Sequence, residues 1–112
     1  MKAIFHVDQS EPFRLAVGNI QNLIAYCQEE KADWEIELLL NGEAVTLAQQ
    51  KKNEANDLSA LSRAGVKIAV CRNAMKKYGI TPQELIPEGT VVPAGVAELV
   101  LRQGQGFAYI KP

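Results

Sequence analysis

Residues 65–78 read GVKIAVCRNAMKKY, and this stretch decides the fold. Residues 66–70 form an apolar run with the length and composition of a buried strand. Gly65 stands where the residue just past a helix end is expected, and residues 72–78, after Cys71, have a helix-like composition. A strand that follows one helix and leads directly into another predicts a parallel sheet with helical crossovers.

The rest of the chain repeats this alternation. Further strands are predicted at residues 2–7, 34–40, 91–92 and 107–110, which are short and mostly apolar. Further helices are predicted at residues 12–31, 44–48, 58–64 and 93–103. The first of these helices carries an apolar stripe at helical spacing, formed by Ala16, Ile20, Leu23, Ile24 and Cys27.

Polar residues and turn formers separate these elements. Residues 49–57 contain no large apolar side chain, which predicts a solvated loop or an exposed helix face. Residues 81–85 predict a single capped turn, with Thr81 as the cap and Pro82 at the first helical position. The helix at residues 93–103 is predicted to present one face formed by Val96, Leu99, Val100 and Gln103.

Short connections between strands and helices predict a three-layer α/β/α sandwich with a mostly parallel sheet of about five strands. The 112 residues are expected to form one domain, residues 1–112. Ligands of such sheets bind beyond the carboxyl ends of the strands. The sequence places seven residues of interest at this edge, namely Asp8, Gln9, Asn41, Gly42, Cys71, Arg72 and Pro93.

The composition disfavours several functional classes. The formal net charge of -1 does not indicate a nucleic-acid binder. No apolar stretch approaches the roughly 20 residues that span a bilayer, and no secretory signal is recognisable, so we expect a cytoplasmic protein without membrane insertion. The two cysteines are then expected to be free thiols. Neither G-x-G-x-x-G nor G-x-x-x-x-G-K-[ST] occurs, so no nucleotide cofactor is predicted.

Cys71 is the residue with the clearest chemical potential. A helix N-terminus presents unpaired N–H groups and a partial positive charge, which favours the reactive thiolate. Arg72, Lys76 and Lys77 add formal positive charge nearby. The commoner role of a cysteine at a strand end is that of a small apolar filler. Residue chemistry alone leaves both roles open.

The other candidate residues indicate structural roles. Cys27 lies on the apolar stripe of the first helix and is predicted to pack in the core. His6 lies within the first strand, where a core or face position is expected rather than general base catalysis. No pair of cysteine or histidine residues has the close spacing of metal ligands, so no metal is predicted. Asp8 is expected to cap the following helix.

Three segments together resemble the DsrE/DsrF family of small sulfur-relay proteins. They are residues 36–45 (IELLLNGEAV), residues 64–75 (AGVKIAVCRNAM), and residues 92–112, which begin VPAGVAEL and end GQGFAYIKP. The resemblance covers essentially the whole chain. The spacing between the cysteine segment and the GFAYI ending makes it specific.

This resemblance implies a DsrE-like fold, assembly into a homotrimer or hexamer, and a possible sulfurtransferase activity. Cys71 matches the family's active cysteine, and would be the catalytic residue that holds sulfane sulfur as a persulfide. The backbone N–H groups of Arg72 and Asn73 would stabilise the anionic sulfur, and Asn41, Gly42 and Asp8 would line the binding edge. No second thiol is expected nearby, so the partners would be sulfur donor and acceptor proteins with their own thiols.

A different class remains open at this point. The chain could be a non-catalytic homo-oligomeric binding or assembly module of the same fold, with an inert Cys71. Its pocket at the carboxyl ends of the strands would then hold a small ligand or a partner loop. Oligomerisation is also expected on physical grounds, because Leu99, Leu101 and Phe107 are predicted to form apolar surface that a monomer leaves uncovered.

Overall fold

The computed structural model describes residues 1–112 and contains a five-stranded sheet in the order β4-β3-β2-β1-β5, with all neighbours parallel. The strands are β1 (Lys2–Val7), β2 (Glu35–Leu40), β3 (Lys67–Cys71), β4 (Gly89–Val92) and β5 (Ala108–Ile110). The α-helices are α1 (Phe13–Glu29), α2 (Glu54–Arg63), α3 (Arg72–Lys77) and α4 (Gly95–Gly104). Two short 3-10 helices are η1 (Gly42–Ala48) and η2 (Pro82–Glu84).

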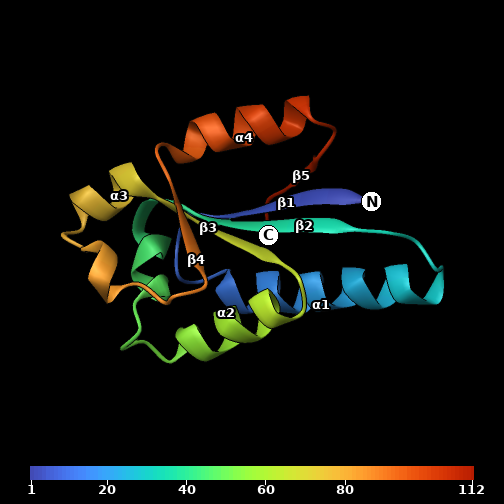
Figure 1. Cartoon of the computed structure of the whole chain (residues 1–112), viewed down its shortest axis with the longest axis horizontal. Helices are drawn as coiled ribbons and strands as arrows, with labels where there is room; N and C mark the ends of the chain where they lie inside the picture. The colour runs from blue at the N-terminus through green and yellow to red at the C-terminus, as the bar shows by residue number, and fades with distance from the viewer.

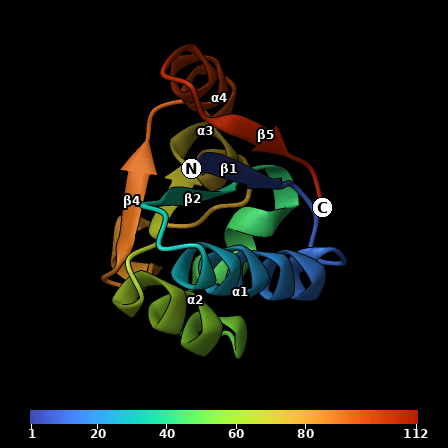
Figure 2. The same ribbon diagram turned by 90° about the vertical axis from the view of Figure 1, so that its right-hand side faces the viewer.

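The sheet lies between two helical layers, which confirms the predicted three-layer α/β/α sandwich. Helices α1 and α2 cover one face of the sheet, and α4 lies alone over the other (Figures 1 and 2). Strands β1 to β4 follow one another in a single direction across the sheet, so right-handed crossovers place α1 and α2 on the same side. The connection from β4 returns across the whole sheet to β5, which places α4 on the opposite side.

The two faces of the sheet are buried unequally. A core of 26 buried residues fills the space between the sheet and α1, α2 and η1. The face beneath α4 has a cluster of only five buried residues, namely Ile4, Leu39, Ala69, Val92 and Phe107. Because apolar burial is the main source of stability, α4 is held to the sheet by a thinner apolar layer than the helices of the other face.

Helix α1 begins and ends where the local sequence requires. Pro12 occupies the position before its first residue, and Lys31, just past its end, adopts a left-handed backbone with φ of 53°. Its predicted apolar stripe is confirmed, since Ala16, Ile20 and Cys27 are fully buried. None of the helices combines the length and the apolar character needed to cross a bilayer.

The prediction for residues 49–57 is confirmed for the exposed loop of residues 50–53 but not for two buried residues. Helix α2 begins at Glu54, where acidic residues in the first turn favour a helix start, and Ala55 already packs into the core. Gln49 is buried as well, and its side-chain amide is satisfied by a hydrogen bond donated to the Glu84 carboxylate at 3.1 Å. The predicted turn after Thr81 is confirmed, and Glu84 accepts hydrogen bonds from both the backbone and the hydroxyl of Thr81.

The outer face of α4 also differs from the prediction. Phe107 is buried, not exposed, and Leu99 points toward the sheet and packs on the smaller core. Val96, Val100 and Leu101 are 68%, 66% and 60% exposed. The apolar surface expected from sequence therefore exists on α4, but a different set of side chains carries most of it.

Candidate functional site

A depression of about 310 Å³ lies where β2 and β3 end and α4 begins. Four of the predicted site residues line it together, namely Asn41, Gly42, Cys71 and Asn73. The rest of the lining comes from α3 and from the start of α4, namely Ala74, Lys77, Ala94, Gly95 and Val96. The sheet topology thus groups most of the predicted site residues, although they are far apart in sequence.

Cys71 is the last residue of β3 and immediately precedes α3. It pairs with Val92 of the neighbouring strand, has extended backbone angles, and is 3% exposed. Its Sγ accepts a hydrogen bond from the Gly95 N–H at 3.2 Å. A thiolate or persulfide at this position would therefore have a backbone donor already in place.

The prediction of the donors to this sulfur is wrong. The Cys71 side chain makes no capping hydrogen bond with the first turn of α3, so the N–H groups of Arg72 and Asn73 do not hold the sulfur. The sulfur instead lies against the first residue of α4, because β3 and β4 are adjacent and the chain turns back over the sheet after Val92. Arg72 is exposed and does not line the depression.

Asn41 and Gly95 determine how closely α4 approaches the strand ends. The Asn41 Oδ1 accepts a hydrogen bond from the Gly42 N–H at 2.8 Å, which fixes the amide at the end of β2. A Cβ placed on Gly95 would lie 2.9 Å from Asn41 Cγ. Only glycine lets the start of α4 lie this close, so Gly95 is the functional residue that sequence reasoning did not single out. Its signal was a glycine opening a predicted helix directly after Pro93 and Ala94.

Asp8 does not cap α1, contrary to the prediction. The helix begins only at Phe13, so Asp8 lies too far upstream, and its carboxylate accepts a hydrogen bond from Lys111 Nζ at 2.8 Å. This bond lowers the pKa of Asp8. The Asp8 side chain does not line the depression, but a Cβ placed on Gly42, which has a left-handed φ of 51°, would lie 2.9 Å from the Asp8 backbone oxygen.

The electrostatics of the depression favour an anion. Lys77 is part of the lining, no carboxylate is, and Lys76 is exposed on the same short helix. His6 does not line the depression. Its Nδ1 instead lies 2.8 Å from the hydroxyl of Tyr109, and burial lowers its pKa. The site therefore combines one sulfur nucleophile with an N–H donor and a nearby cation, without a general base.

Cys27 is a buried packing residue, as predicted. It is 0% exposed on α1, and its Sγ lies 3.8 Å from the sulfur of Met1, which immediately precedes β1. Cys71 lies at the end of a parallel strand, so the two thiols are at opposite edges of the sheet. Both are free cysteines.

The chain is similar to two proteins of known structure and matches one protein family. The protein of unknown function MTH1491 from Methanobacterium thermoautotrophicum is 28% identical, with a TM-score of 0.92 over 99% of this chain and 98% of its own. The ychN protein from E. coli is 20% identical, with a TM-score of 0.76 over 100% of both chains, which shows a shared fold. No curated protein matches the sequence. The profile of the DsrE/DsrF-like family matches residues 2–112, and the chain therefore belongs to the DsrE/DsrF-like family, as its three sequence segments indicated.

Proposed function

We propose that the protein is a sulfurtransferase that carries sulfane sulfur as a persulfide on Cys71 and passes it to the thiol of a partner protein. The observation that carries this proposal is the hydrogen bond from the Gly95 N–H to Cys71 Sγ, within a depression that contains Lys77 and no carboxylate. Membership of the DsrE/DsrF-like family supports a sulfur-relay role. We propose that residues 1–112 act as one domain.

The transfer consists of two thiol exchanges that need no oxidant. The Cys71 thiolate attacks the outer sulfur of a donor persulfide, the sulfur–sulfur bond of the donor breaks, and the donor leaves as a thiolate. An acceptor thiolate then attacks the outer sulfur of the Cys71 persulfide, and the Cys71 thiolate leaves. The Gly95 N–H and the charge of Lys77 would stabilise the negative sulfur that stands at Cys71 before and after each exchange.

The burial of Cys71 sets two conditions on this chemistry. Cys71 is 3% exposed and its sulfur is covered by the Gly95 N–H, so we expect a donor to reach the sulfur only when the Ala94–Gly95 backbone moves away from it. The Cys27 thiol is buried at the other edge of the sheet and cannot resolve the persulfide. Both the donor and the acceptor should therefore be separate thiol-bearing molecules, and we propose that the relay operates in the reducing cytoplasm.

We also propose that the chain assembles into a homotrimer or into a hexamer built from two trimers. The support is the exposed apolar surface formed by Val96, Val100 and Leu101 on α4, since single apolar side chains are common on surfaces but contiguous groups mark interfaces. Size-exclusion chromatography with light scattering at micromolar concentration tests this state. A Leu101→Asp variant should dissociate the assembly, whereas a purely monomeric unmodified protein would reject the proposal.

Intact-protein mass spectrometry tests the sulfur chemistry. The protein is incubated with glutathione persulfide, and the unmodified chain is compared with Cys71→Ser and Cys27→Ser. We expect a gain of about 32 Da, one sulfur atom, that persists in Cys27→Ser and is lost in Cys71→Ser. A gain that survives Cys71→Ser would contradict the assignment.

The near-complete burial of Cys71 favours one competing function. A non-catalytic binding or assembly module of the same fold would keep its thiol buried and would gain no sulfur from the donor. The absence of any mass gain in the unmodified chain would therefore favour the binding module over the sulfur carrier.

A further inference from the structure

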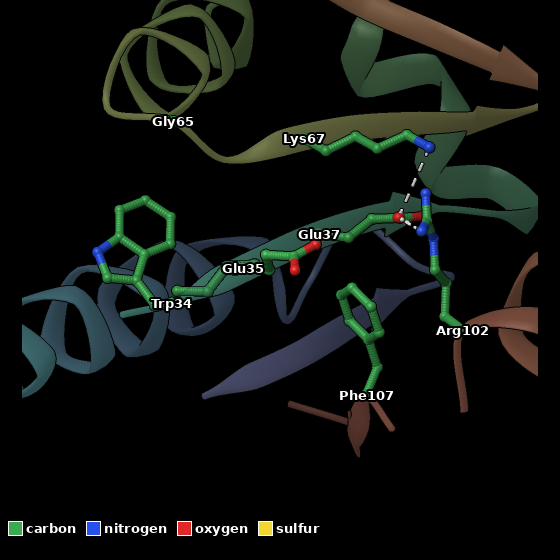
Figure 3. Close-up of a pocket in the computed structure, with 8 residues that line it drawn as sticks. Trp34, Glu35, Glu37, Gly65, Lys67, Arg102 and Phe107 are labelled. Carbon is green, nitrogen blue, oxygen red and sulfur yellow. Dashed lines mark ion pairs between the residues drawn. The ribbon is translucent and has the colours of Figure 1, made fainter. Parts of the chain in front are cut away.

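A partly buried cluster of charged side chains joins the far end of α4 to the sheet (Figure 3). It consists of Glu37 on β2, Lys67 on β3, and Glu98 and Arg102 on α4. Arg102 Nε lies 2.9 Å from Glu37 Oε1 and 3.2 Å from Glu98 Oε2. Lys67 Nζ lies 3.8 Å and 3.5 Å from the same two atoms, so two carboxylates share two cations.

Glu37 is the poorly satisfied member of this cluster. It is 1% exposed, yet neither of its carboxylate oxygens receives an aligned hydrogen bond, because the Arg102 Nε–H is directed at Glu98. Burial raises the pKa of Glu37 to about 7, and the neighbouring Glu98 carboxylate adds to the shift. The interaction with Glu37 in turn lowers the pKa of Glu98. Glu37 therefore gains and loses its proton near neutral pH.

Few other charged groups face Glu37. Its neighbour on β1 is the apolar residue Ile4. The titratable groups on the same face of β1 are Lys2 and His6, two positions to either side of Ile4, and burial lowers the pKa of His6. Glu35 precedes Glu37 on the same face of β2, and both line a depression of about 140 Å³ together with Lys67, Arg102 and Phe107 (Figure 3). The remaining charges around Glu37 are the three other members of the cluster.

Helix α4 connects this cluster to Cys71. Its ten residues span about 15 Å, so its first residue donates to the Cys71 sulfur while its last turn carries Arg102. Figure 1 shows α4 running from the end of the sheet beside α3 back across the sheet, with no other helix on that face. Since its apolar contact with the sheet is thin, the charged cluster is the second anchor of the helix.

The protonation state of Glu37 changes the strength of this anchor. A protonated Glu37 places no charge in the interior and leaves Lys67 on the sheet to pair with Glu98 on α4. An ionised Glu37 is a buried carboxylate without a hydrogen-bond donor, next to a second carboxylate, and such a group is costly even beside a cation. Ionisation should therefore weaken the attachment of α4.

We propose that Glu37 is a positioning residue for Cys71: when protonated it holds α4 on the sheet through Glu98 and Arg102, so that Gly95 caps the sulfur, and its ionisation frees α4 and uncaps the sulfur. This inference rests on the proposed function, since it describes how the sulfur site opens to its partners. The Cys71 sulfur would then be covered by Gly95 in mildly acidic solution and accessible above neutral pH.

The rate of Cys71 alkylation by iodoacetamide tests this proposal. Rates are measured by mass spectrometry from pH 5.5 to 8.5 in a Cys27→Ser background, with Glu37 or with Glu37→Gln, which stays neutral. The ratio of the rate with Glu37 to the rate with Glu37→Gln cancels the ionisation of Cys71 itself. We expect this ratio to rise from about one at low pH to about ten at high pH, because each unit of pKa shift coupled to opening is a tenfold change in an equilibrium.

Glu35→Gln is the matched control, since Glu35 lies on the same face of β2, is exposed, and forms no ion pair. It removes one carboxylate from the same strand without touching the charged cluster. Its alkylation rates should therefore follow those of the unmodified chain at every pH. If the rates with Glu37 and with Glu37→Gln agree within twofold across the whole range, the proposal is overturned.

Hydrogen exchange on the unmodified protein supplies a test that needs no variant. After correction for the intrinsic pH dependence of exchange, residues 93–104 should be less protected than α2 at every pH, and their protection should fall as pH rises. Equal protection in the two segments would mean that α4 opens only by global unfolding and would overturn the proposal. Neither test uses a sulfur donor, so failure of the persulfide experiment and failure of this proposal are separate results.

Discussion

Replacing Glu37 by Gln should remove a specific pH dependence from the stability of this protein. The pKa of Glu37 is about 7 in the folded chain and near 4.5 when the chain is unfolded. Between these two values the folded state binds more protons than the unfolded state, so the free energy of unfolding falls as pH rises. The stabilising contribution of the proton on Glu37 is complete below pH 4.5 and is lost as pH rises through 7.

The size of this effect follows from the shift. Each unit of pKa difference corresponds to about 1.4 kcal/mol, so the full shift corresponds to about 3 kcal/mol between acidic and mildly alkaline solution. This is a large part of the roughly 5–15 kcal/mol that typically separates folded from unfolded domains. Gln at position 37 does not titrate. The free energy of unfolding of the unmodified protein minus that of Glu37→Gln should therefore fall by up to about this amount from acidic to mildly alkaline pH.

Urea unfolding followed by the fluorescence of Trp34, the single tryptophan, measures this difference. Trp34 packs against the larger core beside β2, so its emission reports on global unfolding. Measurements from pH 5 upward avoid the range below pH 4.5, where the lowered pKa of Glu98 makes stability fall with further acidification. Both proteins are compared at one concentration, so that any assembly affects them equally.

His6 affects the same pH range with the opposite sign. Burial lowers its pKa below 6.5, so its contribution to stability is complete above pH 6.5 and is lost as pH falls through the lowered value. Because both proteins contain His6, this contribution cancels in their difference. A difference that stays flat within about 0.5 kcal/mol from pH 5 to 8.5, or one that rises with pH, would refute the reasoning about Glu37.

Two further substitutions test the packing of α4. Gly95→Ala places a methyl group 2.9 Å from the Asn41 side chain, so it should lower the free energy of unfolding by about 1–3 kcal/mol and speed the alkylation of Cys71. Gly104→Ala has open space around it and should lower the free energy of unfolding by nothing. Equal thermal unfolding of the two variants would contradict this expectation. Leu39→Ala removes a fully buried side chain from the thin core beneath α4 and should cost about 2–5 kcal/mol by urea unfolding. A loss below about 1 kcal/mol would mean that this face contributes little to stability.

The order of strands and helices was predictable from sequence because its signals are local. Gly65, the apolar run of residues 66–70 and the helix-like residues after Cys71 each act on their immediate neighbours, and the structure has the strand and the helix in those places. Part of the candidate site followed from one topological rule, since Asn41, Gly42 and Cys71 do meet at the carboxyl edge of the sheet.

The contacts that sequence reasoning missed join distant segments. Asp8 pairs with Lys111, which is 103 positions away, so its role could not be deduced from the helix that follows it. The donor to Cys71 is a backbone N–H on the returning helix, which no side-chain pattern reveals. Within the strand EIELLL, Glu37 is a charge among apolar residues. Its partner Arg102 lies on α4, which follows the crossover from β4 and is far from β2 in sequence.

The place of α4 and β5 at the end of the chain has a consequence for biosynthesis. Strands β1 to β4, helices α1 and α2, and the larger core are all complete once residues 1–92 have been translated. The lone helix of the other face, and with it the cap on Cys71, arrives only with residues 93–112. On the ribosome the Cys71 thiol is therefore synthesised, and the larger core can form around it, before the N–H group that caps its sulfur exists.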